Sequence, residues 1–167
     1  MAYGYMGKST LDVVTSVAAV MFLVAAVAAS VGPARALAQK QDEARIDGVR
    51  NIMEAILELQ TVDPERVDEL REAAEASGAP PRVMVGSADD CSGDWGVQCG
   101  DAVLADHCLD VDPYLSDYLG DAPFDGSDSR YSERQSGYYI DFSPGVLEVG
   151  ACDPGAQEEI RLERTFF

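Results

Sequence analysis

The strongest pattern along the chain is an uncharged apolar run over residues 13–31, VVTSVAAVMFLVAAVAASV. An α-helix of this length measures roughly 28 Å at about 1.5 Å per residue, close to the thickness of the hydrocarbon core of a bilayer. Such a segment must be covered by lipid or by the helices of other subunits, or else be removed. The pattern predicts an apolar helical segment over residues 8–33, up to Gly32 and Pro33.

A helical periodicity continues over residues 34–60 and makes this segment an amphipathic helix. The apolar stripe consists of Val49, Ile52, Met53, Ile56 and Leu57. The residues expected to face away from it are Asp42, Glu43, Arg45, Arg50, Glu54 and Glu58. Together with the apolar run, this predicts one helix over residues 13–60, roughly 70 Å long. The alternative is two helices separated by a kink at Gly32 and Pro33.

A second helix is expected over residues 63–77. Asp63 is suited to the N-cap, Pro64 to the first helical position and Glu65 to the first turn. The helix should stop near Ser77 and Gly78, before two prolines. Residues 82–112 are predicted to be a loop region with at most one strand, at 82–85.

The C-terminal region, residues 113–167, is expected to be rich in β-structure. Apolar and polar residues alternate over 138–142 and 146–149, and Ser143, Pro144 and Gly145 separate the two runs. This is the pattern of a β-hairpin. The predicted fold class is α+β, with a long N-terminal helix packed on a small antiparallel sheet and with disulfides. The globular part covers residues 34–167.

The charge of the chain excludes one class of partner. It has 12 basic and 30 acidic residues, a net charge of −18, and residues 83–167 contain 18 acidic and only 4 basic residues. Such a surface repels nucleic acids. The sequence also lacks a glycine-rich phosphate loop, a Ser-His-Asp arrangement and a pair of histidines. We therefore expect no enzymatic activity.

All four cysteines lie in the C-terminal half, and an even number favours disulfides in an oxidising compartment. Three pairings are open to four cysteines. Cys91 and Cys99 bracket a short loop, and a bridge from Cys108 to Cys152 would fix the last strand of the hairpin to the preceding loop. These two pairs are our prediction. A zinc site at Cys99, His107 and Cys108 is the alternative, but the sequence has no CxxC pair.

A cluster of oxygen ligands, Asp121, Asp125, Ser127 and Asp128, surrounds Gly126. Carboxylates at Asp121, Asp125 and Asp128 would suit Ca²⁺. An ordinary turn stabilised by aspartate side chains is the simpler interpretation. No other cofactor is expected.

The N-terminal sequence GKSTLDVV, residues 7–14, places Asp12 five residues after Gly7 and at the start of the apolar run. It resembles the N-terminus of type IV pilins, whose leader ends in Gly and whose mature chain has an acidic fifth residue. Lys8 and Asp12 stand where family members usually have Phe and Glu. The resemblance implies a leader over residues 1–7, cleavage between Gly7 and Lys8, and pairing of Asp12 with the N-terminal amine of a neighbouring subunit.

Later segments also resemble the heads of pilin-like proteins. They are Pro113-Tyr114-Leu115, Tyr118-Leu119, Ala122-Pro123-Phe124-Asp125, Tyr131, Gly137-Tyr138-Tyr139-Ile140 and Val146-Leu147-Glu148-Val149 before Ala151-Cys152.

The resemblance implies a structural subunit of an extracellular pilus-like filament, or of a short secretion pseudopilus. Its expected partners are further copies of the chain, a prepilin peptidase and the assembly machinery, and the subunit would reside in the inner membrane before assembly. The alternative is a secreted or membrane-anchored binding module. Its signal peptide would be cleaved after Ala38, where Ala36-Leu37-Ala38 matches a cleavage site.

Overall fold

The computed structural model describes residues 10–77, 82–88, 91, 107–153, 155, 157 and 159–165, and for residues 10–14 and 24–31 only the helical backbone. The chain divides into two units, Met1–Ala38 and Gln39–Phe167. We call the second unit the head. All buried core side chains of the described residues belong to it, so the head has a hydrophobic core of its own.

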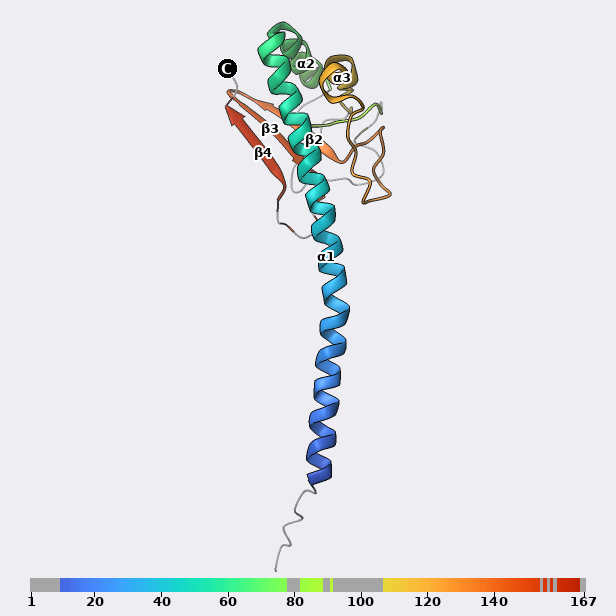
Figure 1. The fold of residues 1–167 in the computed structure, drawn as a ribbon. Coiled ribbons are helices and arrows are strands. Elements are labelled where there is room, and N and C mark those ends of the chain that lie inside the picture. Colours follow the sequence, from blue (N-terminus) through green and yellow to red (C-terminus); the bar gives the residue numbers. More distant parts are fainter. Residues whose placement is uncertain are drawn as a thin grey trace, which may run out of the picture. The chain divides into compact units, whose positions relative to one another are not determined.

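The first helix, α1, spans Thr10–Val62, is 53 residues long and continues through Gly32 and Pro33 (Figure 1). A proline inside a helix removes one backbone hydrogen bond, and the helix accommodates this loss at Pro33. Within the head, the predicted apolar stripe of α1 is confirmed. Val49, Ile52, Met53 and Ile56 are buried in the core, and Leu57 packs against it.

Two residues of α1 do not lie where the periodicity placed them. Asp42 and Arg45 were expected to face away from the core, and both are buried. The expectation was wrong because periodicity sorts residues by polarity alone, whereas these two charges neutralise each other and bind further polar groups of the head. Gly48 is a third special position. A Cβ atom there would lie 2.4 Å from the Tyr138 hydroxyl oxygen, so only glycine leaves room for that side chain.

The second helix is confirmed. α2 spans Pro64–Ala76, and the Asp63 carboxylate caps it by accepting a hydrogen bond from the Arg66 backbone N–H at 3.2 Å. It buries Val67, Leu70 and Ala74 in the same core as α1.

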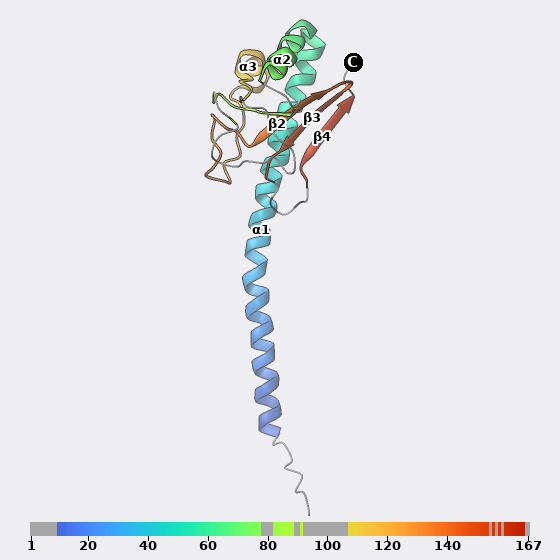
Figure 2. The same ribbon diagram turned by 180° about the vertical axis from the view of Figure 1, so that it is seen from behind.

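The sheet consists of β1 (Arg82–Met84), β2 (Tyr138–Ser143), β3 (Val146–Ala151) and β4 (Arg161–Thr165). The strands pair antiparallel in the order β1-β2-β3-β4 (Figure 2). The predicted strand at 82–85 and the predicted hairpin are confirmed, with Gly145 in the turn at φ +78°. The α+β class with an antiparallel sheet is confirmed as well.

Two elements were not predicted. β4 reads RLERT and lacks the alternation of a half-buried strand. α3 spans Asp112–Leu119, at the start of the region that was expected to be rich in β-structure. With eight residues it has about two turns, too few for a periodic pattern to stand out.

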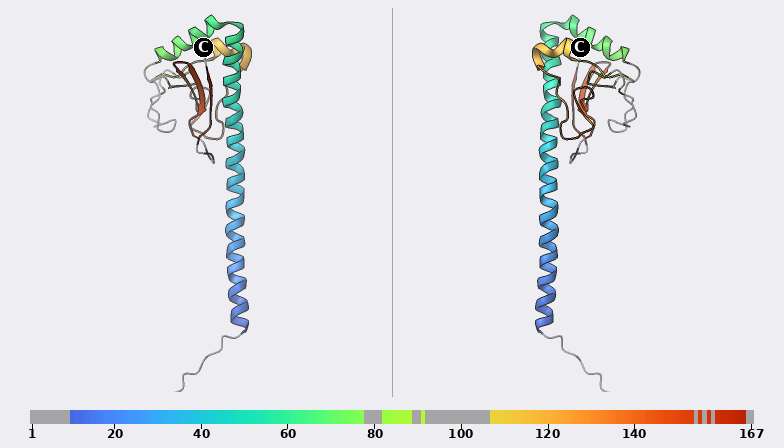
Figure 3. Two further views of the ribbon diagram at one scale, coloured as in Figure 1. Left: turned by 90° about the vertical axis from the view of Figure 1, so that its left-hand side faces the viewer. Right: turned by 90° about the vertical axis from the view of Figure 1, so that its right-hand side faces the viewer.

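The two faces of the sheet differ. One face packs against the head part of α1 (Figure 3) and contributes Ile140, Leu147 and Val149 to the main core. The other face carries a smaller cluster that contains Met84, Tyr139 and three cysteines.

Candidate functional site

The first candidate is an exposed apolar surface on α1. Its large apolar side chains in the described stretch 15–23 are between 53% and 76% exposed: Val17, Val20, Met21, Phe22 and Leu23. Fully burying one side chain of this kind contributes about 1.5–3 kcal/mol. Large exposed apolar patches are typical of places where a protein contacts another molecule.

The residues implied in processing and pairing lie next to this surface in the sequence. Gly7 and Lys8 lie outside the described residues. Asp12 lies in α1, and its side chain is not among those described. Across the part of the chain whose side chains are described, no helical stretch has the length and hydropathy needed to cross a membrane.

The second candidate is a group of buried charged side chains that we call the Arg45 cluster: Asp42, Arg45, Asp125 and Ser127. The Arg45 guanidinium donates through Nη1 to Asp42 at 2.9 Å, through Nε to Asp125 at 2.7 Å and through Nη2 to the Ser127 hydroxyl at 2.8 Å. A planar guanidinium is well suited to such a forked arrangement. The cluster joins α1 to a loop 80 residues further along the chain.

Asp42 extends this cluster to the C-terminal part of the head. Its carboxylate also accepts hydrogen bonds from the backbone N–H groups of Gly155 at 2.9 Å and Gln157 at 3.1 Å. Two segments distant in sequence, one with Asp125 and Ser127 and one with Gly155 and Gln157, are therefore fixed to one turn of α1. Asp42 and Asp125 share the single guanidinium of Arg45, which leaves one negative charge uncompensated. The backbone donors and Ser127 stabilise this remaining charge through hydrogen bonds.

The electrostatics of the cluster follow from its burial. Burial by itself lowers the pKa of Arg45, but hydrogen bonds and charge from Asp125 and Asp42 raise that pKa overall. Burial, reinforced by the nearby Asp125, raises the pKa of Tyr138 to about 12. Both groups therefore keep their protons throughout the physiological range.

The loop that carries the proposed calcium ligands is organised by other interactions. The Asp125 carboxylate accepts from the backbone N–H of Ser127 at 3.0 Å, and Asp128 accepts from that of Arg130 at 2.9 Å. These are the aspartate-stabilised turns of the simpler interpretation. Hydrogen bonds from Arg130 also lower the pKa of Asp128. Asp125 binds Arg45 and Asp128 binds Arg130, so arginines already neutralise two of the three carboxylates.

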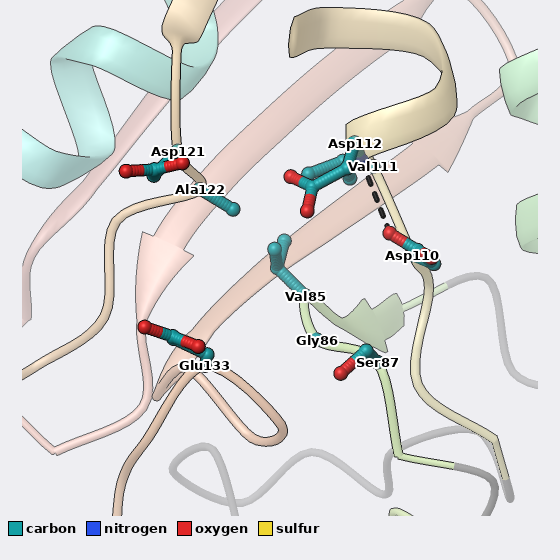
Figure 4. Close-up of a pocket in the computed structure, with 9 residues that line it drawn as sticks. All are labelled: Val85, Gly86, Ser87, Asp110, Val111, Asp112, Asp121, Ala122 and Glu133. Carbon is teal, nitrogen blue, oxygen red and sulfur yellow. Dashed lines mark hydrogen bonds between the residues drawn. The ribbon is translucent and has the colours of Figure 1, made fainter.

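Asp121, the third of these carboxylates, lines a separate pocket of about 190 Å³ (Figure 4). Its other acidic residues are Asp110, Asp112 and Glu133, and the Ser87 hydroxyl also faces it. Asp110 accepts a hydrogen bond from the Asp112 backbone N–H at 3.1 Å. Among the residues with described side chains, no group of three or more His, Cys, Asp or Glu residues is arranged to hold a metal ion. The geometry thus gives the calcium hypothesis no support.

The expectation of a disulfide is confirmed, but the predicted pairing of the cysteines is wrong. A disulfide joins Cys91 to Cys108, with Cα atoms 5.1 Å apart, so neither the Cys91–Cys99 nor the Cys108–Cys152 pair exists. The alternative zinc site also fails, because a cysteine in a disulfide has no thiolate to offer. Cys99 lies outside the described residues, and Cys152 packs in the same cluster as the Cys91–Cys108 bridge.

The reason for this pairing is a tertiary contact. The Leu109 backbone N–H donates to the Met84 carbonyl at 2.8 Å, and that of Gly86 donates to the Leu109 carbonyl at 2.9 Å. These bonds hold the segment around Leu109 against the end of β1. Cys108 is thereby brought near Cys91, a proximity that spacing along the chain did not reveal.

A charged network on the outer face of the sheet was also missed. The Glu148 carboxylate accepts hydrogen bonds from the Tyr139 hydroxyl at 2.7 Å, from Arg82 at 2.7 Å and from Arg161 at 3.5 Å. Arg82 additionally lies over the Tyr139 ring, 4.5 Å from its centroid. The available signal was the alternation in 138–149, which places Tyr139 and Glu148 on the same face once the hairpin register is fixed.

Comparisons with models of protein families, with curated proteins and with solved structures find no match to this chain.

Proposed function

We propose that the chain is a structural subunit of an extracellular pilus-like filament. The observation that carries this proposal is the exposed apolar surface of α1 in a chain whose head already has a core of its own. The resemblance of residues 7–14 to a pilin N-terminus supports the same function. The proposal includes cleavage by a prepilin peptidase, residence in a membrane before assembly and later display outside the cell.

Leaving such a helix in water costs free energy. Burial of a fully exposed side chain of this kind contributes about 1.5–3 kcal/mol, and each of these five side chains, which are 53–76% exposed, would gain a corresponding part of that free energy. Equivalent helices of further copies can bury them without disturbing the head. A contact between different surfaces of identical subunits does not close on itself, and it therefore builds a filament.

The Arg45 cluster has a defined part in this proposal. A helix that joins subunits must transmit force to the head that it carries. Packing of apolar side chains is non-directional, whereas the hydrogen bonds to Asp42 and Arg45 fix the rotation and height of α1 in the head. We infer that the cluster fixes the register between the assembly helix and the surface of the filament.

The test uses Asp12→Ala in the cells that produce the chain. We expect the variant to be made and folded but to form few or no filaments, as seen by electron microscopy with an antibody against the head. Asp47→Ala, which removes an exposed carboxylate from the same helix, is the matched control and should assemble normally. Normal filaments from Asp12→Ala would reject the pairing role of this carboxylate.

The N-terminal residue of the mature protein separates this proposal from its alternative. Cleavage after Gly7 leaves Lys8 first. Cleavage after Ala38 leaves Gln39 first, and this bond is also the boundary between the two units. If sequencing finds Gln39 as the first residue, a secreted binding module is favoured, because the mature protein then lacks the exposed apolar surface of α1.

A further inference from the structure

The two edges of the sheet are not equivalent. At β1, the Met84 carbonyl accepts a hydrogen bond from Leu109, which covers this edge. At the opposite edge, β4 pairs only with β3, and no strand among the described residues lies on its other side (Figure 2). An uncovered edge strand is a template for pairing with another chain.

The register of β3 with β4 shows which backbone groups of β4 are open. The Ala151 N–H donates to the Ile160 carbonyl at 2.9 Å, and Leu162 lies opposite Val149 in the same register. In an antiparallel ladder, residues with backbone groups that face the partner strand alternate with residues whose groups face away. Ile160 and Leu162 therefore face β3, and Arg161, Glu163 and Thr165 present their N–H and C=O groups to the open side, where the Arg164 guanidinium donates to the Glu163 carbonyl at 3.2 Å.

The side chains of β4 give this edge a pattern of charge. Arg161 and Glu163 lie on the outer face of the sheet, opposite Gly150 and Glu148, and are 41% and 52% exposed. The Arg161 guanidinium is 3.3–3.5 Å from oxygens of Glu148, Glu159 and Glu163. One cation thus has three carboxylates around it, which leaves excess negative charge.

The inner side of β4 is apolar at Leu162, whereas Arg164 lies on the same side opposite Leu147. A groove of about 220 Å³ lies between α1 and β4 and is lined by Ile46, Val49, Ile160 and Leu162, with polar residues at its rim. An open strand edge next to an apolar groove fits recognition of an extended segment, in which main-chain hydrogen bonds provide affinity and side chains provide specificity.

We propose that the occupant of this edge is β4 of a second copy of the head, paired antiparallel about a twofold axis at Leu162. In this register Leu162 lies opposite Leu162 of the second copy, next to the apolar groove. Arg161 of each copy lies opposite Glu163 of the other. The two Arg161–Glu163 pairs combine residues whose backbone groups face the open side. Pairing of the strands would replace the hydrogen bond from Arg164 to the Glu163 carbonyl by ladder hydrogen bonds and would satisfy the charges at the same time.

Charge selects this register from the alternatives. A shift by one residue would place residues whose backbone groups face the open side opposite residues whose backbone groups already bind β3. Such a register cannot form the hydrogen bonds of an antiparallel ladder. A shift by two residues keeps the twofold axis and the hydrogen-bond pattern. In one direction it places Glu163 opposite Glu163 of the second copy, and in the other direction it places Arg161 opposite Arg161. Like charges directly opposite each other destabilise a strand pair, whereas opposite charges stabilise it. Of the registers centred on Arg161, Leu162 and Glu163, only the one centred on Leu162 places no charged residue of β4 opposite a like charge.

This contact is distinct from assembly through α1. An isologous contact closes on two copies, so it joins two heads and cannot by itself extend a filament. The strand is short, and the head has 29 acidic and 10 basic residues, a net charge of −19. We therefore expect a weak pair that is favoured by salt, since the screening length falls from about 10 Å at 0.1 M to about 3 Å at 1 M.

The experiment uses the segment 39–167, which contains the complete core and lacks the exposed apolar surface. Failure of head pairing therefore cannot be confused with failure of filament assembly. Sedimentation velocity over a concentration series up to about 1 mM, the weak end of measured affinities, should show a monomer–dimer equilibrium. A segment that stays monomeric over this whole series would overturn the proposal.

Charge reversal provides the decisive comparison. Arg161→Glu and Glu163→Arg each create two like-charge pairs and should raise the dissociation constant about tenfold or more. The double variant restores opposite charges across the twofold axis, and the arginine introduced at position 163 faces Glu148. It should regain most of the affinity. Arg71→Glu, an exposed reversal on α2, is the control and should change little.

Glu163→Arg also separates local pairing from general repulsion. It makes the head less negative, so general repulsion predicts tighter association, whereas the proposed register predicts weaker association. Glu163→Pro removes an open N–H that β3 does not use and should abolish the dimer while circular dichroism shows an intact fold. Dimers that persist in Glu163→Pro, or that tighten in Glu163→Arg, would refute the proposal.

Discussion

Replacing Arg45 with methionine should destabilise the head far more than removal of any exposed arginine. The methionine retains much of the aliphatic stem but removes the hydrogen bonds to Asp42, Asp125 and Ser127. Both carboxylates would then remain buried without a cation. The backbone donors at Gly155 and Gln157 would still bind Asp42, whereas Asp125 would keep only Ser127.

The magnitude follows from the cost of an uncompensated buried charge. Removing one partner of a buried ion pair typically costs about 3–5 kcal/mol, a large part of the 5–15 kcal/mol that stabilises an ordinary domain. For a domain of this size, 1 kcal/mol corresponds to about 4 °C in Tm. We therefore expect Arg45→Met to lower the Tm of the head by about 10–20 °C.

Arg50→Met is a matched control within the same helix. Arg50 binds Asp47 at 2.8 Å with the same i, i+3 spacing as the Arg45–Asp42 pair, but its side chain is 51% exposed, compared with 6% for Arg45. Exposed pairs contribute about 0–1 kcal/mol, so this variant should unfold nearly as the wild type does. Arg45→Lys keeps the charge but not the fork and should be intermediate.

The assay is guanidinium-induced unfolding of the segment 39–167, followed by far-ultraviolet circular dichroism, with thermal melting as a second measurement. An Arg45→Met variant that loses no more free energy of unfolding than Arg50→Met would show that the cluster does not stabilise the head. A decrease in the denaturant slope together with the midpoint would instead indicate a changed native or denatured state.

Two further predictions concern the disulfide and the buried tyrosines. Non-reducing peptide mapping should find Cys91 linked to Cys108, and because the loop spans 17 residues, Cys108→Ser should cost about 3 kcal/mol by chain entropy; a Cys91–Cys99 peptide would contradict the structure. Burial raises the pKa of Tyr131 and Tyr138 from 10 to about 12, so the stability linked to their protonation is fully present below about pH 10 and is lost as the pH rises through about 12. Denaturation measured together with tyrosinate absorbance should show this loss, and tyrosines that ionise near pH 10 in the folded head would rule it out.

The local elements could be read largely from the sequence. The stripe from Val49 to Ile56, the Asp63 cap and the hairpin around Gly145 each depend on neighbours within one or two turns. Short elements were not predicted because they have too few residues for a periodic pattern of apolar and polar positions. This applies to α3, and to β4, whose edge position leaves most of its side chains in water.

Asp42 and Arg45 show what the sequence did not decide. Their partners at Asp125, Gly155 and Gln157 are 80 to 115 residues away along the chain, so polarity alone placed them wrongly on the exposed side of the helix. The Cys91–Cys108 bridge was not predicted because it also depends on a contact between distant segments, the hydrogen bond between Leu109 and Met84. The apolar run, the acidity and the helix and hairpin signals are properties of local sequence, which the sequence determines by itself. Burial of a charge, choice of a disulfide partner and exposure of the β4 edge depend on which distant segments meet, and only the tertiary structure decides this.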